Sequence, residues 1–195
     1  MDGFLFKLIM YVAIVAWLLP PLKQYKDDLF FYFLVLALTD PIAIIIGKLM
    51  HFSPYLFYNF SSVVLLYSLS NFKNLNKKSI SLFFILIIIG YLASQSPSKF
   101  TFYYIILINF IILLKLMVRT LLFVINSSLI NIFHMILILY QTASILKVLS
   151  VVENFSSGIY YFALTNIFQI LIAIFFTIFN ENDKRLFFDL KKFSK

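Results

Sequence analysis

The chain contains no cysteine, which excludes disulfide bridges, thiolate metal ligands and cysteine nucleophiles. Histidine is scarce, with two residues among 195, so neither a zinc site nor any other cofactor site is expected. Charged residues make up only 12% of the sequence, whereas hydrophobic residues make up 63%. Because about a quarter of the residues in a typical soluble domain are charged, this composition excludes a water-soluble globular protein.

Long apolar runs fill the sequence instead, and its mean hydropathy is +0.99. Only helices and closed barrels satisfy the backbone in hydrocarbon, and these runs lack the alternation of barrel strands. The sequence therefore predicts an all-α, polytopic membrane bundle of about seven transmembrane helices in residues 1–180, with no second folded domain. Prolines, helix-capping residues and charged residues place the seven segments at roughly 3–19, 29–50, 55–70, 79–95, 101–121, 127–149 and 158–180.

The boundary between the fifth and sixth segments is open. Residues 101–149 are almost continuously apolar, and only Lys115, Arg119 and the run Asn126–Ser128 favour a turn. One very long tilted helix is the alternative.

Lysine and arginine predict the orientation, because loops rich in these residues stay on the cytoplasmic or matrix side during insertion. We therefore expect the N-terminus outside and the C-terminus inside, with the net charge of +8 drawn to anionic lipid headgroups and no nucleic-acid partner. The twelve cations on the inner side are Lys23, Lys26, Lys73, Lys77, Lys78, Lys115, Arg119, Lys184, Arg185, Lys191, Lys192 and Lys195. The four on the outer side are Lys7, Lys48, Lys99 and Lys147.

The bias towards Phe, Ile, Tyr, Asn and Lys is typical of AT-rich DNA. With the apolar segments, it indicates either a bacterial inner (plasma) membrane or an organellar membrane such as the mitochondrial inner membrane. Residues 181–195 form a basic tail on the cytoplasmic or matrix side. Drawn as a helix, the tail puts Leu186, Leu190 and Phe193 on one stripe, which predicts an amphipathic helix at the lipid surface. A docking strip for a protein partner is the alternative.

Asp40 is the only acid that the predicted spans place inside the membrane. A carboxylate at this depth costs a few kcal/mol, so it should face the bundle interior and be protonated or paired. Pro41 removes one backbone donor and is expected to kink the helix beside Asp40.

Further polar residues at similar depth form a predicted layer around Asp40. On one interpretation the layer is a polar or ion path; on the other, the amides and hydroxyls only join helix to helix, and His134 is a satisfied bundle histidine. The candidate residues are Thr39, Asp40, Asn59, Asn109, His134, Gln141, Asn166 and Gln169.

Lys7, Lys48 and Lys147 lie near outer helix ends and are expected to snorkel to the interface, without chemistry of their own. A second set of cations is expected to contact lipid headgroups or an acidic partner. Its members are Lys115, Arg119, Lys184, Arg185, Lys191 and Lys192.

No catalytic signature is present. The last span lacks the Schiff-base lysine of retinal proteins, and the chain lacks the Gly-x-Ser-Gly turn of rhomboid-like proteases. The sequence therefore favours a non-enzymatic membrane protein: a subunit, scaffold or sensor of a larger membrane complex. The alternative is a small-solute or proton/cation transporter or channel built around Asp40.

An odd number of spans predicts that the two ends of the chain lie on opposite sides of the membrane. An accessibility tag at the N-terminus should be labelled by an impermeant reagent from outside, and a tag at the C-terminus only after permeabilisation. Labelling of both tags from the same side would contradict the predicted topology.

Overall fold

The computed structural model describes residues 3–50, 54–70, 76–95, 98–152 and 158–189. Nearly all of these residues are helical, so the predicted all-α class is confirmed. The helices are α1 (Gly3–Trp17), α2 (Pro20–Lys23), α3 (Phe30–Met50), α4 (Pro54–Ser68), α5 (Lys77–Gln95), α6 (Ser98–Ser127), α7 (Ile132–Val152) and α8 (Gly158–Ile178). A 3-10 turn (Lys184–Leu186) and two short strands, β1 (Leu129–Asn131) and β2 (Phe187–Asp189), complete the described elements.

Several of these helices match the length of a bilayer crossing. In the described ranges, four are long and apolar enough to cross a membrane, and Ala163–Ile178 within α8 is a shorter apolar helix. The structure is thus compatible with a membrane protein, as the composition predicts. The four longer helices are Phe30–Leu49, Lys77–Gln95, Lys99–Ser127 and Ile132–Val152.

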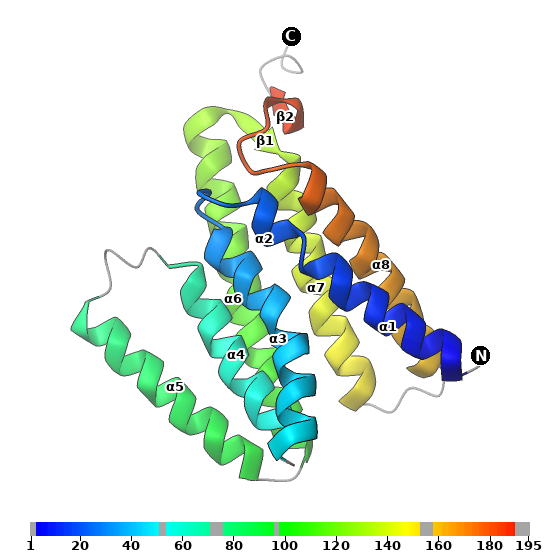
Figure 1. Ribbon diagram of the computed structural model, residues 1–195. Coiled ribbons are helices and arrows are strands. Elements are labelled where there is room, and N and C mark those ends of the chain that lie inside the picture. Colours follow the sequence, from blue (N-terminus) through cyan, green and yellow to red (C-terminus); the bar gives the residue numbers. More distant parts are fainter. Residues whose placement is uncertain (1–2, 51–53, 71–75, 96–97, 153–157, 190–195) are drawn as a thin grey trace.

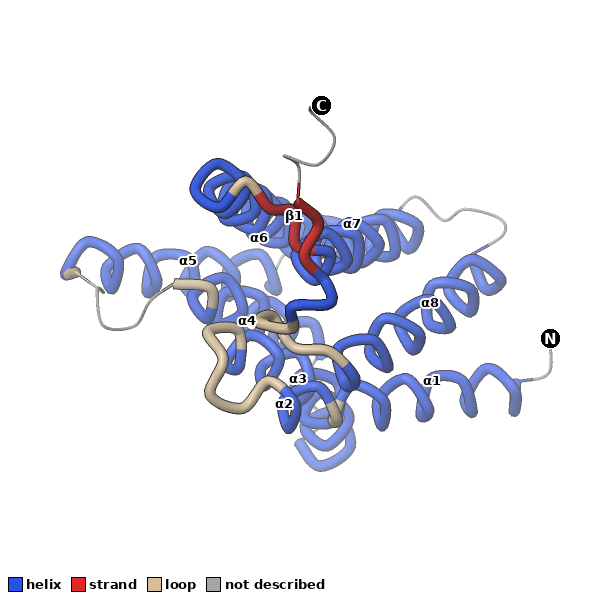
Figure 2. The backbone as a smooth tube through the Cα atoms, turned by 90° about the horizontal axis from the view of Figure 1, so that it is seen from above, coloured by secondary structure: helices blue, strands red, loops and turns tan. Residues whose placement is uncertain are grey.

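The long helices other than α5 follow one another around a ring. The order is α1, α3, α4, α6, α7 and α8, and α8 closes the ring by packing against α1. Helix α5 lies outside this ring, against α4 and α6, and seen from above it occupies the opposite flank from α1 and α8 (Figure 2). Successive long helices run in opposite directions, so the start of α1 and strand β2 lie at opposite ends of the bundle (Figure 1). We refer to the end that carries α2, β1 and β2 as the tail end, and to the other as the distal end.

Residues 101–149 form two helices, which confirms the predicted turn and excludes the single long helix. Helix α6 ends at Ser127, and Ser128 adopts a left-handed backbone conformation with φ of 57°. Helix α7 then begins at Ile132, later than the sequence suggests, because the side chain of Asn131 accepts a hydrogen bond of 2.9 Å from the backbone N–H of Phe133.

The prediction of an amphipathic helix over residues 181–195 is wrong for the part of the tail that the structure describes. After the turn at Lys184–Leu186, β2 pairs antiparallel with β1, with Phe187 opposite Asn131. Leu186 is buried and Phe187 stacks on Phe123 of α6 at 5.8 Å. Packing against the end of the bundle thus satisfies the apolar side chains, and pairing with β1 satisfies backbone groups of β2. Lys191 and Lys192 lie outside the described residues.

Aromatic side chains fill the ring near the tail end. The ring centroid of Phe176 lies 4.8 Å from those of both Phe33 and Phe133, and all three side chains are completely buried. We call Phe33, Phe133 and Phe176 the aromatic plug. Beside it, the Gln24 side chain donates hydrogen bonds to the backbone oxygens of Phe176 and Phe179, which attaches α2 to the last turn of α8.

Helix α5 is attached to the ring through Gly90. Its carbonyl accepts a hydrogen bond of 2.8 Å from the Asn59 side chain of α4, and the Tyr104 hydroxyl of α6 donates to the carbonyl of Leu86 at 2.6 Å. A Cβ atom at Gly90 would lie 3.0 Å from the ring of Tyr104. Gly90 therefore allows the close approach between α5 and α6.

Replacing Gly90 by leucine should displace α5 and lower the free energy of unfolding by about 1 to 3 kcal/mol, as expected for overpacking. Thermal unfolding in mild detergent measures this effect. The matched control is Gly47→Leu, because a Cβ atom at Gly47 has no neighbour within 4 Å. Equal losses of stability in the two variants would contradict the packing role of Gly90.

Candidate functional site

A cavity of about 400 Å³ lies inside the helix ring, and every helix of the ring contributes to its wall. The lining residues come from the second half of α1, the middle of α3 and α8, most of α4, the first half of α6, and α7 from Tyr140 onward. Phe33, Phe133 and Phe176 lie nearer the tail end than the lining residues of α3, α7 and α8, so the aromatic plug lies on the tail side of the cavity. Figure 1 shows the direction of these helices.

A chain of polar side chains crosses the cavity wall from α3 to α6. The Tyr32 hydroxyl donates to the Gln141 side-chain oxygen at 3.0 Å, and the Gln141 amide nitrogen donates to the Asn109 side-chain oxygen at 2.7 Å. Gln141 is almost completely buried. Each such bond contributes about 1 kcal/mol in a membrane bundle, so these predicted amides join helices as well as line the cavity.

Lys147 of α7 lines the cavity, although the sequence assigned it to the membrane interface. Its ammonium group donates to the Asn166 side-chain oxygen at 2.8 Å and to the Gln169 side-chain oxygen at 3.1 Å, both on α8. The expected snorkelling of Lys147 to the interface is therefore wrong. The sequence pattern could have indicated this position, because Lys147 follows Gln141 and Ser144 at three-residue spacing on one face of α7.

Asp40 lines the same cavity from α3. The Tyr58 hydroxyl of α4 donates to Asp40 Oδ1 at 3.1 Å, and Asp40 lies close enough to Lys147 for the two side chains to interact electrostatically. Among the described residues that line the cavity, Asp40 and Lys147 alone carry a charge. Thr39 also lines it, but its hydroxyl donates to the carbonyl of Val35 on its own helix at 2.7 Å.

Helix α3 remains continuous through Pro41, and the kink expected there stays a prediction. Two other predicted members of the polar layer do not line the cavity. Asn59 faces α5 through its hydrogen bond to Gly90, and His134 lies at the tail end. Both are nonetheless buried and hydrogen-bonded, which is what the helix-joining interpretation expects.

A second polar cluster closes the tail end. Glu181, which follows α8, accepts a hydrogen bond from Arg119 of α6 at 2.6 Å and contacts His134 Nε2 of α7 at 2.7 Å. Its backbone oxygen also accepts a hydrogen bond from the Asn131 side chain at 3.0 Å. We call Arg119, His134 and Glu181 the tail latch. The sequence offers no signal for Glu181, because an acid in a short polar segment is usually solvated.

The tail latch keeps Glu181 ionised. Burial acts to raise the pKa of this carboxyl, but the hydrogen bond from His134 and the charge of Arg119 outweigh burial, and the net pKa lies below its usual value of 4.5. His134 Nδ1 is buried and has no hydrogen-bond partner among the described residues.

Comparison with known protein families, curated proteins and solved structures found no match. No group of three or more His, Asp or Glu side chains that could hold a metal occurs in the ranges that the structure describes.

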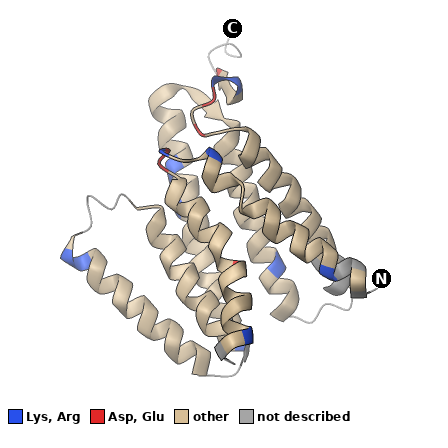
Figure 3. Ribbon diagram, in the orientation of Figure 1, with Lys and Arg blue, Asp and Glu red and all other residues tan. Residues whose placement is uncertain are grey.

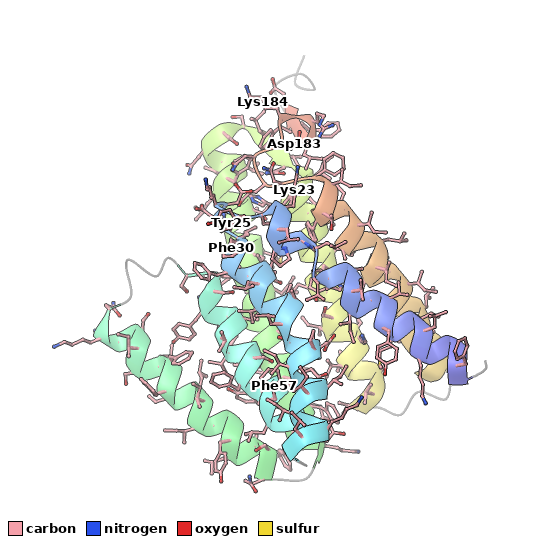
Figure 4. The ribbon with its side chains drawn as sticks, in the orientation of Figure 1. Lys23, Tyr25, Phe30, Phe57, Asp183 and Lys184 are labelled. Carbon is pink, nitrogen blue, oxygen red and sulfur yellow. The ribbon has the colours of Figure 1, made fainter. Side chains whose placement is uncertain are left out.

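The remaining predicted contact residues that the structure describes lie at the tail end or near it. Lys115 donates to the Ser70 hydroxyl at 3.0 Å, and Arg185 pairs with Asp183 at 2.7 Å. Figure 4 labels Asp183 and Lys184 beside Lys23 at this end, and Figure 3 shows charged residues of both signs there, with further cations on α1, α3, α5 and α7. Their contacts with lipid headgroups or a partner, and that of Arg119, stay predictions.

Neutralising Glu181 should loosen the tail end. Glu181→Gln leaves Arg119 without its close partner and should lower the free energy of unfolding by about 1 to 3 kcal/mol at neutral pH. Since the folded-state pKa of Glu181 is depressed, its stabilisation is present above pH 4.5 and is lost as the pH falls through the folded-state pKa. Thermal unfolding of wild type and variant in detergent should therefore converge in acid.

The matched control is Asp28→Asn, which removes an acid 87% exposed and 3.5 Å from the same arginine. This substitution should change stability little, because an exposed ion pair contributes at most about 1 kcal/mol. A constant difference between wild type and Glu181→Gln across the whole acid range would contradict the role assigned to the carboxylate.

Proposed function

We propose that the protein is a seven-span integral membrane protein that binds a small polar solute in the ring cavity and carries it across the bilayer. The observation that carries this proposal is a cavity of about 400 Å³ within the helix ring, lined mostly by apolar residues and also by the exposed Asp40 and the partly buried Lys147. Ionisable groups within a membrane bundle are costly, and where they face an internal cavity they mark a substrate or ion path. A cavity of this volume falls in the range of about 300 to 1,000 Å³ that is typical of small-molecule sites.

The cavity favours a solute over a free cation or proton path. Lys147 adds a positive charge to the same cavity as Asp40, and a positive charge in a narrow apolar space repels cations. The polar amides Asn109, Gln141, Asn166 and Gln169 provide directional hydrogen bonds, which suit an organic solute with several polar groups. The alternative that the sequence left open was a transporter or channel for a small solute, a proton or a cation, built around Asp40. We restrict this alternative to a solute transporter that uses Asp40 and Lys147 together.

The proposed orientation puts the distal end outside and the tail end inside. It is supported by the alternating direction of the long helices and by the cations of the tail end, among them Lys23, Arg119 and Lys184 (Figure 3). In this orientation the aromatic plug and the tail latch lie between the cavity and the inner side. Release of a solute to the inside then requires the plug to rearrange, as in alternating access.

A second candidate function is the membrane subunit, scaffold or sensor that the sequence alone favours. The observation in its favour is α5, which lies outside the ring and exposes large apolar side chains such as Phe84 and Ile88 along its length. A protein partner in the membrane would pack against this exposed face of α5. We further propose that the protein contacts anionic lipid headgroups and lies in a bacterial inner membrane or an organellar one. Protein partners belong to this second candidate function. No enzymatic role is proposed.

The transport proposal predicts that Asp40→Asn and Lys147→Gln each reduce solute uptake at least ten-fold. The measurement is uptake into liposomes that contain the full chain, with a panel of labelled amino acids, sugars, polyols and amines as probes. Asp28→Asn, an exposed acid at the tail end, is the matched control and should transport as the wild type does. Uptake no faster than in empty liposomes for every probe, or full uptake by both cavity variants, would overturn the proposal.

A further inference from the structure

The two charges of the cavity have opposite sign, and this restricts the charge of a ligand. A solute with a single positive charge is attracted by Asp40 and repelled by Lys147, and a solute with a single negative charge meets the reverse. A molecule that carries one positive and one negative group satisfies both side chains and leaves neither charge without a counter-charge.

The hydrogen bonds of the cavity orient these charged side chains. Asn166 and Gln169 of α8 hold the Lys147 ammonium by their side-chain oxygens, at 2.8 and 3.1 Å, inside the ring instead of at the interface. Tyr58 fixes Asp40 through one carboxylate oxygen at 3.1 Å, and a carboxylate can accept further hydrogen bonds on its two oxygens. The positive site therefore lies on the α7 and α8 side of the cavity, and the negative site lies on the α3 and α4 side.

Apolar side chains form the rest of the wall. Trp17 of α1 packs on Tyr140 of α7 with a centroid distance of 4.5 Å, and both rings line the cavity together with Ile14, Leu65 and Phe102. Such a wall accommodates a hydrophobic side chain next to the polar groups. The cavity thus combines an acid, a base and an apolar surface within about 400 Å³.

From this arrangement we infer that the solute is a zwitterion of the amino-acid type, with its carboxylate at Lys147 and its ammonium group at Asp40. This inference rests on the proposed function, since it assigns the class of solute to the same cavity. Its apolar group lies against Trp17 and Tyr140. The binding step is non-covalent, and no group is transferred.

Trp17 offers a direct measurement, because it is the only tryptophan of the chain and lines the cavity. The full chain in detergent micelles is titrated with L-leucine and with its two singly charged analogues, 3-methylbutylamine and 4-methylpentanoate, while tryptophan emission is recorded. L-phenylalanine is compared in the same way with 2-phenylethylamine and 3-phenylpropanoate. At least one of the two zwitterions should change the emission saturably and bind at least ten-fold more tightly than either of its analogues.

Two variants separate ligand recognition from general damage to the fold. Lys147→Gln retains a hydrogen-bonding side chain but removes the positive charge, so the amine should now bind at least as tightly as the zwitterion. Asp40→Asn should produce the reverse, with the carboxylate gaining relative to the zwitterion. A shift of preference in opposite directions is not expected from loss of structure, and circular dichroism of both variants checks that the helices are retained.

The outcomes also separate this inference from the proposed function. Equal or tighter binding of a singly charged analogue to the wild type, or a saturable response to sugars or polyols without one to the two amino acids, would overturn the zwitterion and leave solute binding intact. If none of the amino acids, sugars, polyols and amines changes Trp17 emission or enters liposomes, both the inference and the proposed function fail.

Discussion

The cost of placing charged and polar groups inside an apolar helix bundle is the constraint on which the rest of the structure depends. Lys147 lies on the inner face of α7, and its ammonium group has the side-chain oxygens of Asn166 and Gln169 as partners. Asp40 meets the same constraint through Tyr58 and through the proximity of Lys147. Helices α3, α4, α7 and α8 therefore converge on one polar space, because hydrocarbon offers these groups no alternative partner.

The two ends of the ring meet the constraint in different ways. At the distal side the polar groups surround a cavity, whereas at the tail side Phe33, Phe133 and Phe176 pack closely enough to leave their side chains no exposed surface. Beyond the aromatic plug, Glu181 binds Arg119 and His134 and so joins α6, α7 and the segment after α8. This asymmetry is the basis of the proposed transport role, in which the aromatic plug and the tail latch close one side of the cavity.

Much of the fold follows from composition and spacing. The apolar runs are predictable because each helix must cover a length comparable to the bilayer, and the turn at Asn126–Ser128 was visible as the only run of three consecutive polar residues between Arg119 and residue 149. Among the candidate site residues, Asp40, Asn109, Gln141, Asn166 and Gln169 were predicted and do line the cavity. Asn59 was predicted at the same depth as Asp40 but faces α5, because depth along a helix does not specify the direction of a side chain. His134, another candidate, lies at the tail end.

The tail is a second case in which spacing along the sequence did not determine the structure. The sequence contains a stripe of Leu186, Leu190 and Phe193 at helical spacing, yet Phe187–Asp189 is a strand because β1 provides its backbone partners and Phe123 packs on Phe187. Helical spacing predicts which face of an isolated segment is apolar. It does not predict which other segment of the chain packs against that face.

The sequence by itself determined the all-helical class, the apolar character of the segments and the presence of a single acid within them, since these depend on residue type and local periodicity. Only the tertiary structure decided that Lys147 faces inward beside Asn166 and Gln169, and that Glu181 reaches Arg119 and His134. The physical reason is that the cost of burying a charge depends on the distance to its partner. That distance is set by the packing of helices that lie far apart along the chain.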